Sequence, residues 1–145
     1  MNDLRTPLSV ANELRPVVLQ LNRHLRRELA PLDVTAGQAA LLHAIRTNPG
    51  IGVRTLADQE GVSPPRVTAA LDRLESMGLV RRARSGSDRR RVELQVTDEG
   101  RRVLRSARSR RTAWLAARLA RLTPADLDAI ASAVPALRRL LTDRA

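Results

Sequence analysis

Arginine carries the most evident chemistry in this sequence. All 26 basic residues of the 145-residue chain are arginine, and against 15 acidic residues they give a formal net charge of +11. Two segments concentrate them: residues 81–91 hold six arginines and one aspartate, and residues 100–121 hold eight arginines and no acid. A guanidinium group binds phosphate oxygens or a guanine edge through paired hydrogen bonds, so these clusters point to a polyanionic partner.

A high arginine content alone is weak evidence for such a partner. Exposed arginines are usually only solvated, and a GC-rich genome raises their number without functional selection. Six positive charges in one short segment nevertheless repel one another and need a compensating partner. The question is therefore whether the fold presents these side chains together.

The other residue types disfavour most other chemistry. Cysteine is absent, and His24 and His43, the only histidines, do not lie at metal-ligand spacing, so no metal and no cofactor are expected. We find no glycine-rich phosphate loop, no HExxH motif and no paired carboxylates, so we expect no enzyme activity. No apolar run approaches the roughly 18 residues of a membrane span, and the first residues do not resemble a signal peptide. We expect a cytoplasmic protein with no membrane contact.

Two helices around a tight turn are predicted in the middle of the chain. A short helix spans 53–61. Ser63 is expected to cap the second helix, which has Pro64 at its first position and stops at Gly78. This is the pattern of a helix-turn-helix.

A hairpin is predicted directly after the second helix. Residues 79–84 and 90–96 read as strands joined by the loop 85–89, because apolar and polar side chains alternate along the second strand. The fold class is therefore mainly α with a small β-hairpin wing, a winged helix-turn-helix lobe over residues 35–100.

Further helices are predicted on both sides of this lobe. Residues 7–30 form an amphipathic helix, in which Pro16 is expected to cause a kink or a break. Thr35 and Gln38 form a capping box at the start of a helix that ends near Arg46, before the Asn-Pro-Gly turn.

The C-terminal part is predicted to hold two helices. Thr97 caps a long helix that ends near Leu122. The last helix starts at Thr123-Pro124 and is expected to be interrupted or bent at Pro135.

A winged helix-turn-helix positions its arginines for DNA. Its second helix fits a major groove about 12 Å wide, and the wing reaches the backbone and the neighbouring minor groove. Arg66 and Arg73, seven residues apart on one edge of the second helix, and Thr68 near the other edge are the expected base and phosphate readers. The complete set of expected DNA-binding residues is Ser63, Arg66, Thr68, Arg73, Arg84, Asp88, Arg89, Arg90 and Arg91.

The ordered motifs of residues 53–100 resemble the MarR family of bacterial transcription regulators. The quoted pieces are Val-Arg-Thr-Leu-Ala from 53, Gly-Val-Ser-Pro from 61, Asp-Arg-Leu-Glu from 72, Gly-Leu-Val-Arg-Arg from 78, Asp-Arg-Arg from 88 and Val-Thr-Asp-Glu-Gly from 96. The resemblance implies that Asp88 orients the wing and that Arg90 enters the minor groove. Ala69 and Arg66 depart from residues common in the family, which leaves the target sequence open.

The resemblance also implies a homodimer. In this family the first and last helices of two chains interleave, so residues 7–30 and 101–143 are the expected dimerisation helices of a single MarR-like domain over 1–145. Twofold symmetry places the two second helices about 34 Å apart, so the DNA partner is expected to be a near-palindromic operator.

Members of the family often bind small aromatic acids, and the long helix has one candidate effector site. Arg111 and Arg118 fall on its apolar face with Trp114, where they are suited to the carboxylate of such an acid. In the alternative, these arginines pair with acids such as Glu13 or Glu28 across the dimer.

The function expected from the sequence is a sequence-specific, double-stranded DNA-binding transcriptional regulator. It is expected to be a repressor that a small effector relieves. The alternative is a nonspecific architectural protein that binds DNA or RNA, because such a protein uses the same arginine electrostatics.

Overall fold

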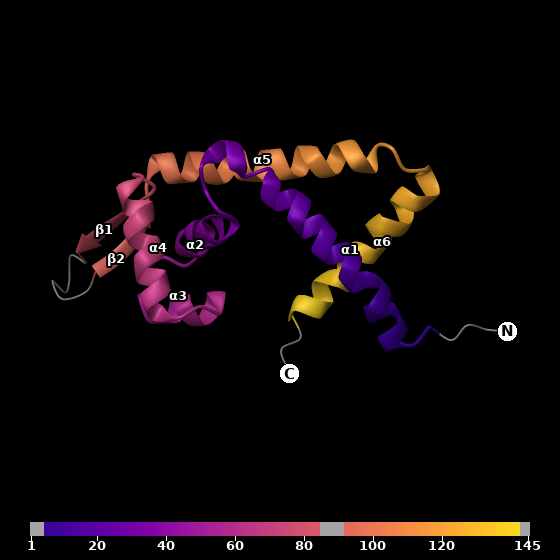
Figure 1. Ribbon diagram of the computed structural model, residues 1–145, viewed down its shortest axis with the longest axis horizontal. Coiled ribbons are helices and arrows are strands. Elements are labelled where there is room, and N and C mark those ends of the chain that lie inside the picture. Colours follow the sequence, from indigo (N-terminus) through magenta and orange to yellow (C-terminus); the bar gives the residue numbers. More distant parts are fainter. Residues whose placement is uncertain (1–4, 85–91, 143–145) are drawn as a thin grey trace. The chain divides into compact units, whose positions relative to one another are not determined.

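The computed structural model describes residues 5–84 and 92–142 (Figure 1). They form six α-helices, one 3-10 helix and one hairpin. In chain order the elements are α1 Pro7–Arg27, η1 Ala30–Leu32, α2 Ala36–Thr47, α3 Val53–Glu60, α4 Pro64–Ser76, β1 Val80–Arg84, β2 Val92–Val96, α5 Asp98–Leu119 and α6 Pro124–Thr142. The fold class predicted from the sequence is confirmed.

Local capping signals explain most of the helix ends. Thr35 and Gln38 make both hydrogen bonds of the expected capping box at the start of α2. Gly61 follows α3 with φ of +64°, a left-handed conformation that glycine adopts without strain. Thr6 and Ser9 form a second capping box at the start of α1, which the sequence reading did not identify.

The chain is not broken at either helical proline, and the kink at Pro16 and the bend at Pro135, the other expected outcomes, stay predictions. α1 is one continuous helix across Pro16, so the break considered from the sequence is wrong. α6 likewise continues through Pro135, which excludes the interruption expected there. A proline in a helix removes one backbone donor, but both prolines lie on exposed segments, where water can bond the freed carbonyl. α1 ends at Arg27, before the predicted residue 30, and the short 3-10 helix η1 begins at Ala30.

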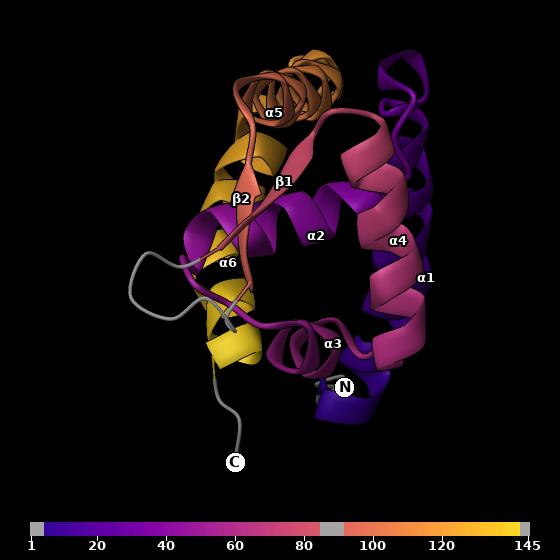
Figure 2. The same ribbon diagram turned by 90° about the vertical axis from the view of Figure 1, so that its left-hand side faces the viewer.

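The chain divides into two compact units, residues 1–111 and 112–145, with the boundary inside α5. The first unit contains the winged helix-turn-helix, where α2, α3 and α4 surround a common core and the antiparallel hairpin packs on α2 and α4 (Figure 2). Its largest fully buried side chains are Leu29, Leu42, Leu56, Val67, Leu71 and Leu74. The second unit contains α6, none of whose described residues is buried in the single chain.

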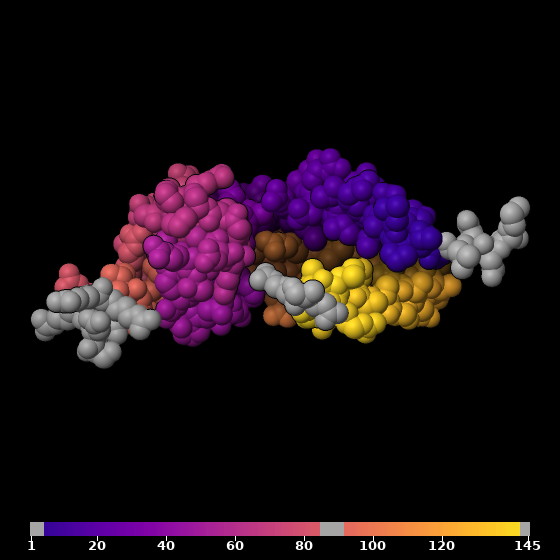
Figure 3. Space-filling view, turned by 90° about the horizontal axis from the view of Figure 1, so that it is seen from below, coloured from indigo at the N-terminus to yellow at the C-terminus, as the bar shows by residue number. Residues whose placement is uncertain are grey.

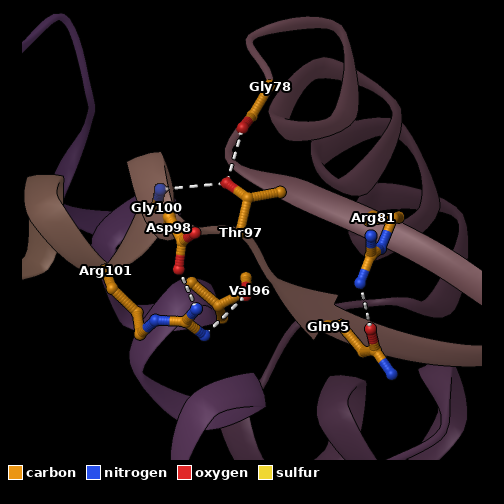
Figure 4. A network of polar contacts seen from close by, with 8 residues as sticks. All are labelled: Gly78, Arg81, Gln95, Val96, Thr97, Asp98, Gly100 and Arg101. Carbon is orange, nitrogen blue, oxygen red and sulfur yellow. Dashed lines mark hydrogen bonds and ion pairs between the residues drawn. The ribbon is translucent and has the colours of Figure 1, made fainter.

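Hydrogen bonds of Thr97 join the turn after α4 to the start of α5 (Figure 4). The Thr97 hydroxyl donates to the Gly78 carbonyl oxygen at 2.6 Å and accepts from the Gly100 amide at 3.0 Å, as a helix cap does. The Thr97 amide donates to the Leu79 carbonyl oxygen at 3.1 Å. Gly100 lies so close to this turn that a Cβ atom would overlap the Leu79 carbonyl oxygen and come within 2.7 Å of Val96 Cγ1.

We predict that Gly100→Ala destabilises the protein by about 2–3 kcal/mol, because the added methyl group forces the α4–β1 turn and α5 apart. Urea denaturation at fixed protein concentration measures the change. Gly37→Ala is the matched control, since its Cβ would meet nothing closer than Thr35 Oγ1 at 3.9 Å, and its stability should stay within about 0.5 kcal/mol of wild type. Equal effects of the two substitutions would show that the contact at Gly100 is not needed.

Candidate nucleic-acid interface

Helix α4 turns one face to the core and the other to solvent. Val67, Leu71 and Leu74 are buried, whereas Arg66 and Arg73 are exposed. No ion pair joins either arginine to another residue within 5–84 or 92–142, so both guanidinium groups are available to a ligand. Figure 3 shows in magenta the surface of the unit that carries α3 and α4.

Thr68 is also exposed on α4, and its hydroxyl is already partly used. It donates to the Pro64 carbonyl oxygen one helical turn back at 3.1 Å. The hydroxyl oxygen can still accept a hydrogen bond, and the methyl group can contact a thymine methyl. Thr68 is therefore suited to accept from a base rather than to donate to a phosphate.

Ser63 occupies the N-cap position of α4, as expected, but its side chain makes no capping hydrogen bond. Pro64 and Pro65 fill the first two helical positions and have no N–H group. The prediction that the Ser63 side chain caps α4 is therefore wrong. The exposed Ser63 hydroxyl retains its capacity to bond a phosphate.

The wing is described up to its tip. Arg84 is exposed at the end of β1, opposite Val92 of β2. The remaining predicted wing residues, Asp88, Arg89, Arg90 and Arg91, lie outside the described residues. Their expected roles remain predictions.

Arg82 has a partner within the lobe, which the sequence reading missed. Its guanidinium binds the Asp72 carboxylate at 2.8 Å and the Glu75 carboxylate at 3.0 Å, both on α4. These bonds join the base of the hairpin to α4 and neutralise one charge of the 81–91 cluster. The spacing of Asp72 and Glu75, three residues apart on one helix face, was the available signal.

All three residues of the predicted effector site, Arg111, Trp114 and Arg118, lie on α5. The Arg118 guanidinium stacks on the Trp114 ring at 4.3 Å from its centroid, a cation–π contact. The Nε atom of Arg111 is buried and has no hydrogen-bond partner among the described residues. The neighbouring Arg110 donates to the Glu28 carbonyl oxygen at 2.8 Å and lies 3.5 Å from the Glu28 carboxylate, so Glu28 has a partner in its own chain.

None of the helices in the described residues is both long and apolar enough to cross a membrane. Among the same residues, no group of three or more histidine and acidic side chains is arranged to hold a metal ion.

A helix-turn-helix followed by an antiparallel hairpin is the fold of the winged helix DNA-binding proteins, and here the second helix also exposes arginines. The MarR family model matches residues 34–92. An uncharacterized HTH-type transcriptional regulator of Mycobacterium bovis is 31% identical over 134 residues, which cover 92% of this chain and 94% of the relative. The chain belongs to the MarR family of transcriptional regulators and is a DNA-binding regulator.

Solved structures agree with this assignment. A putative transcriptional regulator from Pseudomonas aeruginosa is 31% identical with a TM-score of 0.80, over 95% of this chain and 99% of that one. A MarR family protein of Mycobacterium tuberculosis, crystallised with salicylic acid, is 26% identical with a TM-score of 0.69, over 94% of this chain and 99% of that one.

We predict that Arg82 and Arg84 contribute differently to DNA binding. Arg84→Gln should reduce the slope of log affinity against log salt by about one unit and leave stability unchanged, because it removes one unpaired charge. Arg82→Gln should leave that slope unchanged and cost about 0.5–1 kcal/mol of stability, because its two partly exposed ion pairs are lost. Fluorescence anisotropy with labelled duplex at several salt concentrations, together with urea denaturation, measures both. If Arg82→Gln flattens the slope as much as Arg84→Gln, Arg82 contacts phosphate.

Proposed function

We propose that the protein is a homodimeric, sequence-specific repressor that binds a near-palindromic operator and releases it when a small aromatic acid binds. The solvent face of α4 carries this proposal, because Arg66, Thr68 and Arg73 lie there without acidic partners among the described residues. These side chains can reach base edges and phosphates in a major groove. Such a regulator acts where the bacterial chromosome lies, in the cytoplasm.

The exposed apolar residues of the flanking helices support a dimer. α1 has no buried residue and exposes Leu8, Val17 and Leu19, with Leu8 72% exposed. α6 exposes a second row, in which Leu141 is 82% exposed. Apolar surfaces of this extent are rare on soluble monomers. We infer that a second copy of the chain covers them and that residues 7–30 and 101–143 supply the dimer contacts.

Repression follows from the footprint of such a dimer. Two α4 helices about 34 Å apart cover two successive turns of one duplex face, and a protein seated there blocks other proteins from the same DNA. DNA upstream of the protein's own gene is the first operator to test. A specific regulator prefers it over random duplex by about a thousandfold or more, whereas an architectural DNA or RNA binder has no such preference.

We predict that Arg90→Ala and Arg66→Ala weaken DNA binding in different ways. Arg90→Ala should weaken binding to all sequences and reduce the salt slope by about one unit, because it removes a positive charge that enters the minor groove between the phosphate strands. Arg66→Ala should mainly relax discrimination at one base position, at a cost of about 1–3 kcal/mol for the preferred base. Binding to a library of single-base operator variants measures both. Identical profiles for the two variants would contradict the division of roles.

The effector part of the proposal assigns Arg111, Trp114 and Arg118 to an aromatic acid. The unpartnered Nε of Arg111 supports an anionic ligand, since a buried donor without an acceptor is costly. The stacked Arg118 already covers one face of the Trp114 ring, so an acid would take the outer edge of that guanidinium. The salicylic acid complex of the mycobacterial relative supports the ligand class.

We predict that a panel of phenolic acids including salicylate raises the melting temperature of the wild-type protein and weakens operator binding. Arg118→Ala should lose both responses, because it lacks the carboxylate partner. Differential scanning fluorimetry and operator anisotropy measure them. Arg121→Ala, which removes another exposed arginine, from the turn after α5, is the control and should respond like wild type. An unchanged melting temperature and unchanged DNA affinity in wild type and Arg118→Ala alike would refute the effector role.

A further inference from the structure

A pocket of about 350 Å³ lies entirely within the winged lobe, where the end of α2, the base of the hairpin and the first turn of α5 meet. Three arginines from these three elements line it: Arg46, Arg81 and Arg101. Its apolar lining includes Ile45, Pro49 and Leu94. None of the three arginines is among the residues expected to bind DNA or effector.

The charges of this pocket are not balanced by the described residues. Arg81 donates to the neutral Gln95 Oε1 at 2.8 Å, so it keeps its full positive charge. Arg46 forms no ion pair with another described residue. Arg101 pairs with the Asp98 carboxylate and also donates to the Val96 carbonyl oxygen at 3.1 Å. One carboxylate therefore faces three guanidinium groups, and an anion would relieve their repulsion.

Figure 4 shows how two of these arginines are held. The Arg101 guanidinium and the Arg81–Gln95 pair lie on either side of the end of β2, and each is fixed by a hydrogen bond to the protein. Side chains that are already oriented lose little conformational entropy when they bind a ligand. The apolar lining gives the same ligand a surface for a ring or a branched carbon chain.

We propose that this pocket binds a small organic carboxylate with an apolar body, and that Arg46 and Arg81 bind its carboxylate group. The volume is at the low end for ligand pockets, of about 300–1,000 Å³, which favours a ligand of the size of a single-ring acid. Such a ligand connects α2, β1 and α5 at the base of the wing. The regulatory consequence rests on the proposed repressor function: the bound acid changes operator affinity by altering how the wing is held.

Isothermal titration calorimetry of the full-length protein with benzoate tests the site. We expect benzoate to bind, and benzyl alcohol, which has the ring without the charge, and acetate, which has the charge without the ring, to bind at least tenfold more weakly. In the Arg118→Ala protein, which lacks the carboxylate partner proposed on α5, Arg46→Gln and Arg81→Gln should each weaken benzoate binding by at least about tenfold, because each removes a charge-assisted hydrogen bond. Arg54→Gln, an exposed arginine of α3 outside the pocket, should bind benzoate as wild type does.

Several outcomes would overturn the inference. Absence of benzoate binding would do so, as would acetate or inorganic phosphate binding as tightly as benzoate. Benzoate binding that survives Arg46→Gln and Arg81→Gln but is lost in Arg118→Ala would place the acid on α5, which rejects the pocket and leaves the proposed function standing. A lower salt slope for operator binding by Arg46→Gln in benzoate-free buffer would assign the arginine to DNA phosphate. A separate measurement tests the proposed function: equal affinity of the wild-type protein for upstream and random DNA would contradict it.

Discussion

The geometry of the winged lobe depends on the contact between the backbone of Gly100 and the carbonyl group of Leu79. This contact brings the first turn of α5 against the turn that follows α4, and Thr97 closes it with hydrogen bonds to both sides. A larger side chain at residue 100 has no room. The end of α4, the base of the hairpin and the start of α5 are therefore held in one arrangement, which sets the direction in which the wing leaves the lobe.

The arginines of the lobe serve at least two different purposes. Arg82 stabilises the packing of β1 on α4, because both of its ion-pair partners are carboxylates of α4. Arg66, Arg73 and Arg84 extend from exposed positions and pair with no described acid. The net charge of the chain therefore overstates the charge available to DNA. The position of each guanidinium relative to nearby carboxylates decides whether it binds a partner or supports the fold.

Much of the fold could be predicted from the sequence, because local chemistry decides it. The Thr35–Gln38 capping box and the glycines after α3 and α4 act over three or four residues, and the structure has them as expected. Contacts between elements could not be predicted in the same way. The Arg82 pairs and the meeting of Arg46, Arg81 and Arg101 depend on packing between separate elements. The capping bond of Ser63 is absent partly for a local reason, because Pro65 removes one of the two backbone amides that an N-cap side chain can bond.

The two consecutive prolines at the start of α4 have a consequence for how the protein meets its target. Each pyrrolidine ring holds φ near −65°, the value of a helix, so the first turn has little conformational freedom even before the rest of α4 forms. A helix ordered in advance loses less entropy on association than one that must fold on the surface it binds. The N-terminal turn of α4 should therefore bind DNA as a rigid body. It could not change its conformation to improve its contacts with a DNA duplex of the wrong sequence.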